Sequence, residues 1–332
     1  MKQPHITFKW CEFIMILILC QCACSTAFYH SSSQLLWRTS LGSSKNNMDI
    51  EKLMSKHDPI LLFASRLLPQ TVAADASALY AWCRRLDEIT DNPNNRNVTQ
   101  IQDDLDDWQY RFEKLWNGEP VDDMDAALYE CVQRQGGALT KDLFHDMLAG
   151  MRSDNVACRR IQNMDELELY AYQVAGTVGL MLLPLLEADI EMAREPAIAL
   201  GKAIQLINIL RDATPDAQLF RIYIPKDLMK ANSVTEEDVL ALRTSTGYRA
   251  TVKHVADRAN DLLSEAEAGR STLPGLGPLF IQIIIELYRE YLDRLEKLEF
   301  NNLIKGKSRV RISTSRKLTA TARALGTILS EE

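Results

Sequence analysis

The sequence predicts a nearly all-helical protein. Its apolar residues recur in long runs with helical periodicity. Clusters of β-branched residues and the short turn signals that join paired strands are few. We therefore expect a single domain made of successive helices.

Turn-forming residues bound the predicted helices. The first follows Pro69 through "TVAADASALYAWCRRLDEIT" and ends at "DNPNN". Later helices are predicted over residues 99–116, 123–135, 140–151, 165–189, 193–213, 246–269, 277–300 and 313–329. After the N-terminal segment, no run of consecutive apolar residues is predicted to be long enough for a membrane span, and Phe280–Leu287 comes closest.

Composition and charge exclude some classes of function. The 332 residues are 46% hydrophobic and 25% charged, which is ordinary for a globular protein. The net charge is −7; the first 48 residues carry +3, so the remainder carries −10. An acidic body argues against nucleic-acid binding, which requires a basic surface. Local arginines or metal ions would therefore have to bind any anionic substrate.

The first 48 residues have the composition of a targeting presequence. Two lysines precede a short apolar run, Phe13 to Leu19, and small residues close it at Ser25-Thr26-Ala27, as in a signal peptide covering residues 1–27. Residues 28–48 are rich in serine and contain no acid, as in a transit peptide. This bipartite pattern resembles the presequences of algae whose plastids lie inside extra membranes. We therefore expect plastid import and one folded domain over residues 49–332; a simple secretory signal is the alternative.

Two aspartate pairs are the main chemical signal. Asp87 and Asp91 lie in "RRLDEITD", and Asp212 and Asp216 lie in "NILRDATPD". Residues four apart share a helix face, so like charges at this spacing repel unless a cation lies between them. Mg²⁺ binds one or two carboxylates together with phosphate oxygens and water. Two such pairs on separate helices predict Mg²⁺ ions, with Mn²⁺ as a substitute, held against a diphosphate.

Arginines beside both pairs strengthen this interpretation. Arg84, Arg85 and Arg211 lie next to the acids, and the planar guanidinium group binds diphosphate through paired hydrogen bonds. For one isolated aspartate pair a solvent-exposed face would be the better explanation. Two pairs, each at the end of an apolar helix and each beside arginine, favour a diphosphate site.

Several segments resemble those of a known enzyme family. "ALYAWCRRLDEITDN", "FHDMLAGMRSD", "LYAYQVAGTVGLM", "AIQLINILRDATPDAQLFRIYIPKDLM" and "EYLDRLEKLEFNNLIKGKSRV" are similar to the trans-isoprenyl diphosphate synthases that join two chains head to head. This is the phytoene and squalene synthase family, and the likeness extends over residues 55–325. The resemblance implies the all-α isoprenoid synthase fold, with helices around a deep apolar cavity.

The resemblance also assigns roles by position. Asp87, Asp91, Asp212 and Asp216 would bind metal and take part in catalysis. Further catalytic positions are Tyr80, Arg84 and Tyr170. Substrate-binding positions by this resemblance are Gln205, Asn208, Arg221 and Arg309. Arg85 and Arg211 are also predicted to bind substrate, because they lie beside the acids.

The implied reaction is the head-to-head condensation of two geranylgeranyl diphosphates. It passes through a cyclopropyl (prephytoene) diphosphate to phytoene, the first committed step of carotenoid biosynthesis, and no NADPH is expected. Because the product is an insoluble hydrocarbon, we also expect peripheral contact with a plastid membrane and with downstream carotenoid enzymes.

One departure from the family pattern bears on activity. Thr214-Pro215 replaces the usual Gly-Glu of the second aspartate motif. Because proline lacks an N–H, Pro215 is expected to end the helix just before Asp216 and to reduce or redirect its function. Two alternatives therefore stay open: a squalene or dehydrosqualene synthase using farnesyl diphosphate, and a non-catalytic organellar assembly factor of the same fold.

Overall fold

The computed structural model describes residues 45–57, 70–90, 98–156, 158–304 and 309–330. Within these ranges the chain is helical and forms no strand; one isolated parallel bridge joins Arg160 to Ile222. The predicted all-α fold is confirmed.

The helices follow the predicted order. They are α2 (Lys45–His57), α4 (Gln70–Thr90), α5 (Val98–Trp116), α6 (Asp123–Gln135), α7 (Lys141–Asp154), α8 (Met164–Ala171), α9 (Thr177–Leu182), α10 (Ile190–Gln218), α11 (Lys226–Ala231), α12 (Glu236–Leu240), α13 (Thr246–Ala268), α14 (Gly277–Lys297) and α15 (Thr314–Leu329). A π-helical turn, Tyr172–Gly176, joins α8 to α9, and short 3₁₀ turns lie at 136–138, 184–186 and 270–272. Helix α2 and the short helices α11 and α12 were not predicted.

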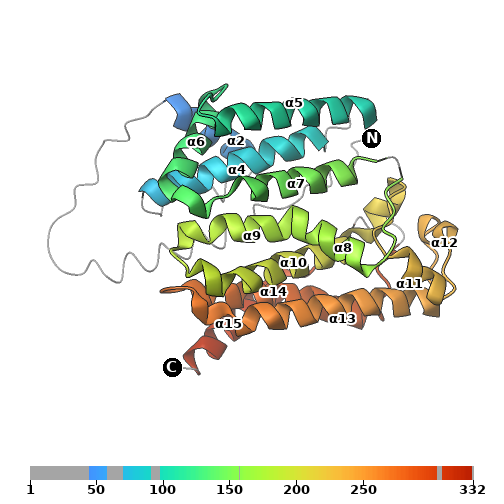
Figure 1. The fold of residues 1–332 in the computed structure, drawn as a ribbon. Coiled ribbons are helices and arrows are strands. Elements are labelled where there is room, and N and C mark those ends of the chain that lie inside the picture. Colours follow the sequence, from blue (N-terminus) through green and yellow to red (C-terminus); the bar gives the residue numbers. More distant parts are fainter. Residues whose placement is uncertain (1–44, 58–69, 91–97, 157, 305–308, 331–332) are drawn as a thin grey trace.

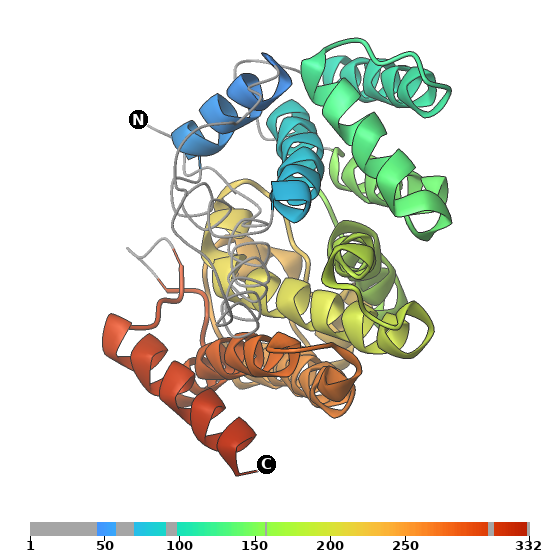
Figure 2. The ribbon, with the colours of Figure 1, turned by 90° about the vertical axis from the view of Figure 1, so that its left-hand side faces the viewer.

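The helices are stacked in tiers. Figure 1 shows α2 and α4–α7 above α8–α10, with α13–α15 below. In the perpendicular view α2 lies beside α4 at one edge and α15 lies against α14 at the opposite edge (Figure 2). The long helix α10 is central, since it packs against α8, α9, α13 and α14.

Residues before the predicted domain boundary belong partly to the fold. Helix α2 begins at Lys45, four residues before Asp49, and buries Ile50 and Met54. It packs against α4 and α6. Residues 1–44 lie outside the described part of the chain, and the bipartite presequence stays a prediction.

One described stretch has the length and hydropathy of a membrane span, contrary to the expectation from consecutive apolar residues. It is Met164–Leu186, and 72% of its most apolar window is buried among other helices. Its small residues allow close packing: a Cβ added to Gly179 would lie 2.8 Å from the Ala197 carbonyl oxygen. Gly179 therefore allows close packing of α9 against α10.

The prediction that Pro215 ends its helix is wrong. Helix α10 continues to Gln218, and Asp216 is a buried residue of its last turn. Pro215 cannot donate a hydrogen bond to the carbonyl of Arg211, four residues earlier. The backbone N–H of Val310 donates to that carbonyl instead, at 3.0 Å. The helix therefore continues because a distant segment satisfies the carbonyl group that proline leaves open.

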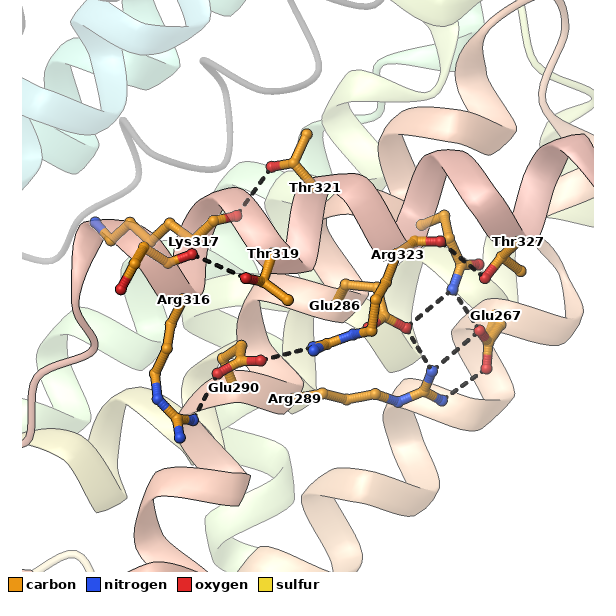
Figure 3. Close-up of polar contacts among 12 residues, drawn as sticks. Glu267, Glu286, Arg289, Glu290, Arg316, Lys317, Thr319, Thr321, Arg323 and Thr327 are labelled. Carbon is orange, nitrogen blue, oxygen red and sulfur yellow. Dashed lines mark hydrogen bonds and ion pairs between the residues drawn. The ribbon is translucent and has the colours of Figure 1, made fainter.

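A charge network holds the C-terminal helix in place. Arg323 of α15 donates to Glu286 and Glu290 of α14, and Arg316 donates to Glu290 at 2.7 Å (Figure 3). On the neighbouring helix, Glu267 accepts from Arg289 at 2.6 Å. Because Glu286 and Glu290 are buried, these arginines compensate charges that would otherwise be costly.

Candidate active site

One face of α4 carries three of the predicted site residues. Tyr80, Arg84 and Asp87 are spaced by four and three residues, so they share a helix face. All three are buried. Arg84 Nε lies 3.7 Å from Glu88 Oε1. Asp91 lies outside the described residues.

One face of α10 carries the second set. Gln205, Asn208, Asp212 and Asp216 are spaced by three, four and four residues. All but Asn208 are nearly fully buried. The last turns of this helix therefore present two amide and two carboxylate side chains on one side.

Two arginines hold Asp212. Arg211 donates to both of its oxygens, at 3.1 Å and 2.6 Å. Arg309 Nε lies 3.4 Å from Asp212 Oδ1. Although burial opposes its charge, the hydrogen bonds to Asp212 raise the pKa of Arg211, so the guanidinium stays protonated. Both arginines, predicted as substrate-binding, thus lie at a predicted metal ligand.

The α10 face contains buried oxygen acceptors with no hydrogen-bond partner among the described residues. They are Gln205 Oε1, Asn208 Oδ1 and Asp216 Oδ1. A buried polar atom left unpaired costs about 1–3 kcal/mol. Three such oxygens on one face make this face a candidate for ligand binding.

These oxygens fit a hard divalent cation bound together with a ligand. Mg²⁺ prefers oxygen ligands and takes only one or two carboxylates when phosphates supply the rest. Within the described ranges no group of three or more His, Cys, Asp or Glu side chains forms a ready-made metal cage. Asp212, Asp216 and Asp87 are accordingly the described residues that could hold Mg²⁺ against a diphosphate.

A further carboxylate, that of Asp154, lies near Asp216 and was not predicted. Asp154, the last residue of α7, accepts a 2.6 Å hydrogen bond from the Tyr223 hydroxyl, and Arg221 Nη1 lies 3.7 Å from its other oxygen. Tyr170 stacks on Tyr223 with ring centroids 5.7 Å apart. The predicted residues Tyr170 and Arg221 are therefore brought together with Asp154 and Tyr223.

Electrostatics link this group to α10. Burial raises the pKa of Asp216 well above its ordinary value of 3.8, and the charges of Asp212 and Asp154 add to the effect while Arg221 opposes it. Burial likewise raises the pKa of the Tyr170 hydroxyl, with Asp154 adding to it. Burial and these neighbouring negative charges therefore disfavour the ionised form of Asp216, which a bound cation would favour.

Sequence reasoning missed Asp154 and Tyr223, although both lie in segments that resemble the family. One signal could have found Asp154. A carboxylate at the C-terminal end of a helix is disfavoured by the helix dipole, so its presence there indicates a purpose other than helix stability.

Arg85 lies apart from the other predicted substrate-binding residues. It donates to Asp122 and Asp125 of α6 at 2.9 Å and 3.1 Å, and its guanidinium carbon lies 4.7 Å from the centre of the Trp108 ring. These contacts join α4 to α5 and α6. They do not support the prediction that Arg85 binds substrate.

Helices α4, α7 and α10 all end toward the right-hand side of Figure 1. In sequence, Asp87, Asp154 and Asp216 belong to the last turns of these three helices. A small apolar pocket lies elsewhere, between α9, α10, α13 and α14, and is lined by residues such as Gly179, Pro196 and Leu200. None of the predicted site residues lines it. A deep cavity beside the aspartates stays a prediction.

The fold and the aspartate-bearing faces define an all-α protein of the isoprenoid synthase type. A family model described as squalene/phytoene synthase matches residues 54–316, and that range covers most of the 332 residues. The chain therefore belongs to the squalene/phytoene synthase family.

Relatives and solved structures agree with this family. Phytoene synthase 1, chloroplastic, of Solanum lycopersicum is 39% identical over 73% of this chain and 58% of its own length. Phytoene synthase 2, chloroplastic, of the same plant is 38% identical over 73% of this chain and 77% of its own length. Phytoene synthase 1, chloroplastic, of Arabidopsis thaliana is 39% identical over 69% of this chain and 54% of its own length. The chain thus spans little more than half the length of two of these relatives.

Among solved structures, a crystal structure of a dehydrosqualene synthase with ligand has a TM-score of 0.71 and 29% identity, over 86% of this chain and 97% of that one. The squalene synthase HpnC from Alicyclobacillus acidocaldarius has a TM-score of 0.70 at 22% identity, over 77% of this chain and 95% of that one. The second likeness concerns the fold alone.

Proposed function

We propose that this chain is a Mg²⁺-dependent prenyltransferase that condenses two geranylgeranyl diphosphates head to head to give phytoene. The observation that carries the proposal is the row of unpartnered buried oxygens on α10, Gln205 Oε1, Asn208 Oδ1 and Asp216 Oδ1, beside Asp212. The identity of 38–39% to named phytoene synthases supports the geranylgeranyl substrate over a shorter one.

The site residues have separate roles in this proposal. When bound, Mg²⁺ neutralises the diphosphate and helps it leave. Asp87, Asp212 and Asp216, with Asp91, hold the metal, while Arg84, Arg211, Arg221 and Arg309 bind and orient phosphate oxygens. The buried ring of Tyr170 could stabilise the developing allylic cation through its π electrons. Buried apolar residues around these groups exclude water, which would otherwise quench the cation.

A direct assay tests this function. The purified protein is incubated with geranylgeranyl diphosphate and Mg²⁺, without NADPH, and the extracted lipids are separated by chromatography. We expect a phytoene peak that disappears with a chelator and with Asp87→Asn or Asp212→Asn. The exposed Asp107 of α5 offers a matched control, Asp107→Asn, which should leave the peak unchanged.

Two other results would change the assignment. Product from farnesyl diphosphate alone would move the chain to the squalene and dehydrosqualene branch. A folded protein silent with both substrates would favour the non-catalytic assembly factor, although the sequence retains all four aspartates.

We also propose peripheral membrane contact through α15. Leu318, Leu325 and Leu329 are exposed and, at spacings of seven and four residues, lie on one helix face. Residues 309–330 contain no acid. Arg309, Arg316 and Arg323 pair with acids of the protein itself, whereas the exposed Lys317 of α15 suits an anionic lipid surface. The protein should float with anionic vesicles, and replacing the three leucines by serine should abolish this, whereas serine at the exposed Tyr110 of α5 should not. Wild-type protein that fails to float would exclude the contact.

Plastid import is proposed on the basis of the presequence composition and of the relatives named chloroplastic. A reporter carrying residues 1–48 should enter plastids in an algal host, and secretion of the reporter would support the simple signal instead. Contact with downstream carotenoid enzymes stays a prediction.

A further inference from the structure

The Thr214 side chain binds the segment that follows α14. Its hydroxyl donates to the Asn302 carbonyl at 2.9 Å and accepts from the Ile304 N–H at 3.0 Å. Thr214 and Asn302 are both about 1% exposed. A glycine, the usual residue of the family at this position, has no hydroxyl group and could form neither bond.

Pro215 binds the same segment indirectly. Because it has no N–H, the Arg211 carbonyl is left open within α10 and accepts the Val310 N–H at 3.0 Å. A glutamate here would supply an N–H that competes for that carbonyl. Both departures from the family motif therefore favour contacts between α10 and the C-terminal segment.

Asn302 adds a third point of attachment. Its side-chain amide donates to the Leu210 carbonyl at 2.9 Å, and its side-chain oxygen accepts from the Tyr248 hydroxyl at 2.7 Å. Residues 302–304 and Val310 are thus bonded to Leu210, Arg211 and Thr214 of α10. We call these contacts the α10 clasp.

The clasp places a charged side chain at the site. Arg309 directly precedes Val310, and its Nε lies 3.4 Å from Asp212 Oδ1. A long arginine side chain loses much conformational entropy when it is held, so a fixed backbone lowers the cost of keeping it there.

We propose that Thr214 and Pro215 are positioning residues that hold Arg309 at Asp212 for binding of a Mg²⁺-diphosphate group. This rests on the proposed function, since it assumes that diphosphate binds beside Asp212. In this proposal Thr214-Pro215 orders the site in place of the usual Gly-Glu and is not a defect in the second aspartate motif.

Hydrogen exchange of the full-length protein tests the clasp without any substrate. The Val310 and Ile304 amides should be protected in the wild type. Exchange at Val310 should speed at least tenfold in Pro215→Ala, and exchange at Ile304 in Thr214→Val, while Thr214→Ser stays close to wild type. Pro196→Ala, at the other proline inside α10, and Thr251→Val, at a buried threonine bonded within α13, are the controls and should change neither amide. Fast exchange at Val310 in the wild type would overturn the clasp.

Binding of inorganic diphosphate in the presence of Mg²⁺, measured by calorimetry, tests the positioning. Arg309→Ala should weaken binding, and Thr214→Val should weaken it about three- to tenfold. In the Arg309→Ala background, Thr214→Val should have no further effect, because it acts only through Arg309. If Thr214 had only a structural role, Thr214→Val would lower the melting temperature, and its effect on binding would not depend on Arg309.

The outcomes separate the two proposals. Additive losses in the double variant, or full affinity in Thr214→Val when exchange at Ile304 is fast, would overturn the positioning role. No Mg²⁺-dependent diphosphate binding by the wild type would contradict the proposed function and the role of Arg309 with it, whereas the exchange result would still decide the clasp.

Discussion

The Tyr223 hydroxyl donates a hydrogen bond to Asp154 Oδ1 at 2.6 Å, and this pair lies at the buried carboxylate of Asp216. The bond fixes one oxygen of Asp154, and Arg221 approaches the other. Because the Asp154 charge helps to raise the pKa of Asp216, its position affects how readily Asp216 ionises to bind a cation. On the proposed function, the pair would therefore support the site through Asp216, without a tyrosine oxygen touching the substrate.

Replacing Tyr223 by phenylalanine tests this relationship. The lost bond should lower the free energy of unfolding by about 1 kcal/mol and Mg²⁺-dependent turnover by up to about tenfold, because Asp154 is no longer fixed. Tyr172→Phe is the matched control, since Tyr172 donates to Asp146 at 2.8 Å away from the aspartate motifs. It should show a similar loss of stability in urea and unchanged turnover. Equal turnover in both variants would remove Tyr223 from the site.

Arg85 should contribute to stability and not to substrate binding. Arg85→Gln removes the bonds to Asp122 and Asp125, but Arg111 also pairs with both acids. We therefore expect a loss of about 1 kcal/mol in the free energy of unfolding, with kcat and KM unchanged. Arg84→Gln, on the adjacent face, should instead reduce kcat/KM more than tenfold. A raised KM in Arg85→Gln would restore the original prediction.

Local patterns were enough to predict most of the fold. Long helices such as α10 and α13 have clear periodicity and boundaries, and their ends agree with prediction to within a few residues except at Pro215. The exception has a tertiary cause, because the group that satisfies the Arg211 carbonyl lies at Val310, 99 residues away in sequence. The short helices α11 and α12 have too few residues to show a helical period.

Two kinds of signal predicted the candidate site residues. Spacing along one helix placed Asp212 and Asp216 on one face. Tyr170, Arg221 and Arg309 were predicted only through the resemblance to the family, and Arg85 only because it lies near Asp87 in sequence. Adjacent residues on a helix point in different directions. The Arg85 side chain therefore contacts α6, whereas Arg84 and Asp87 lie on another face of α4. Asp154 and Tyr223 meet only through tertiary structure, which no local pattern contains.

Gly201 should tolerate no side chain. A Cβ at this position would lie 2.6 Å from the Ala175 carbonyl oxygen and 2.7 Å from Gly176 Cα, where α10 crosses the π-helical turn. Gly201→Ala should therefore lower the free energy of unfolding by about 1–3 kcal/mol through overpacking. Gly326→Ala on α15 is the contrasting variant: nothing lies within 4 Å of its added Cβ, so it should stabilise the protein by up to about 1 kcal/mol. Urea unfolding measures both, and a stable Gly201→Ala would mean that the helices can separate there at little cost.

Acid should weaken the attachment of α14 to its neighbours α13 and α15. Hydrogen bonds from Arg289 hold the pKa of Glu267 below its ordinary value of 4.5 despite burial. Burial would raise the pKa of Glu290, but bonds from Arg323 and Arg316 lower it overall. Since the folded pKa values are depressed, the stability that these carboxylates add is complete above about pH 5 and is lost as pH falls through 4.5 and below.

Removing one of these charges should make the free energy of unfolding depend less on pH in acid. Glu290→Gln should cost about 1–3 kcal/mol at pH 7, because it leaves Arg316 and Arg323 without a charged partner at that position. Its stability should then fall less than that of the wild type between pH 5.5 and about 3.5, since one depressed pKa is gone. Glu296→Gln, at an exposed glutamate of the same helix, should keep the wild-type pH dependence. Urea unfolding across this range measures all three proteins, and parallel curves for Glu290→Gln and the wild type would show that Glu290 does not carry the effect.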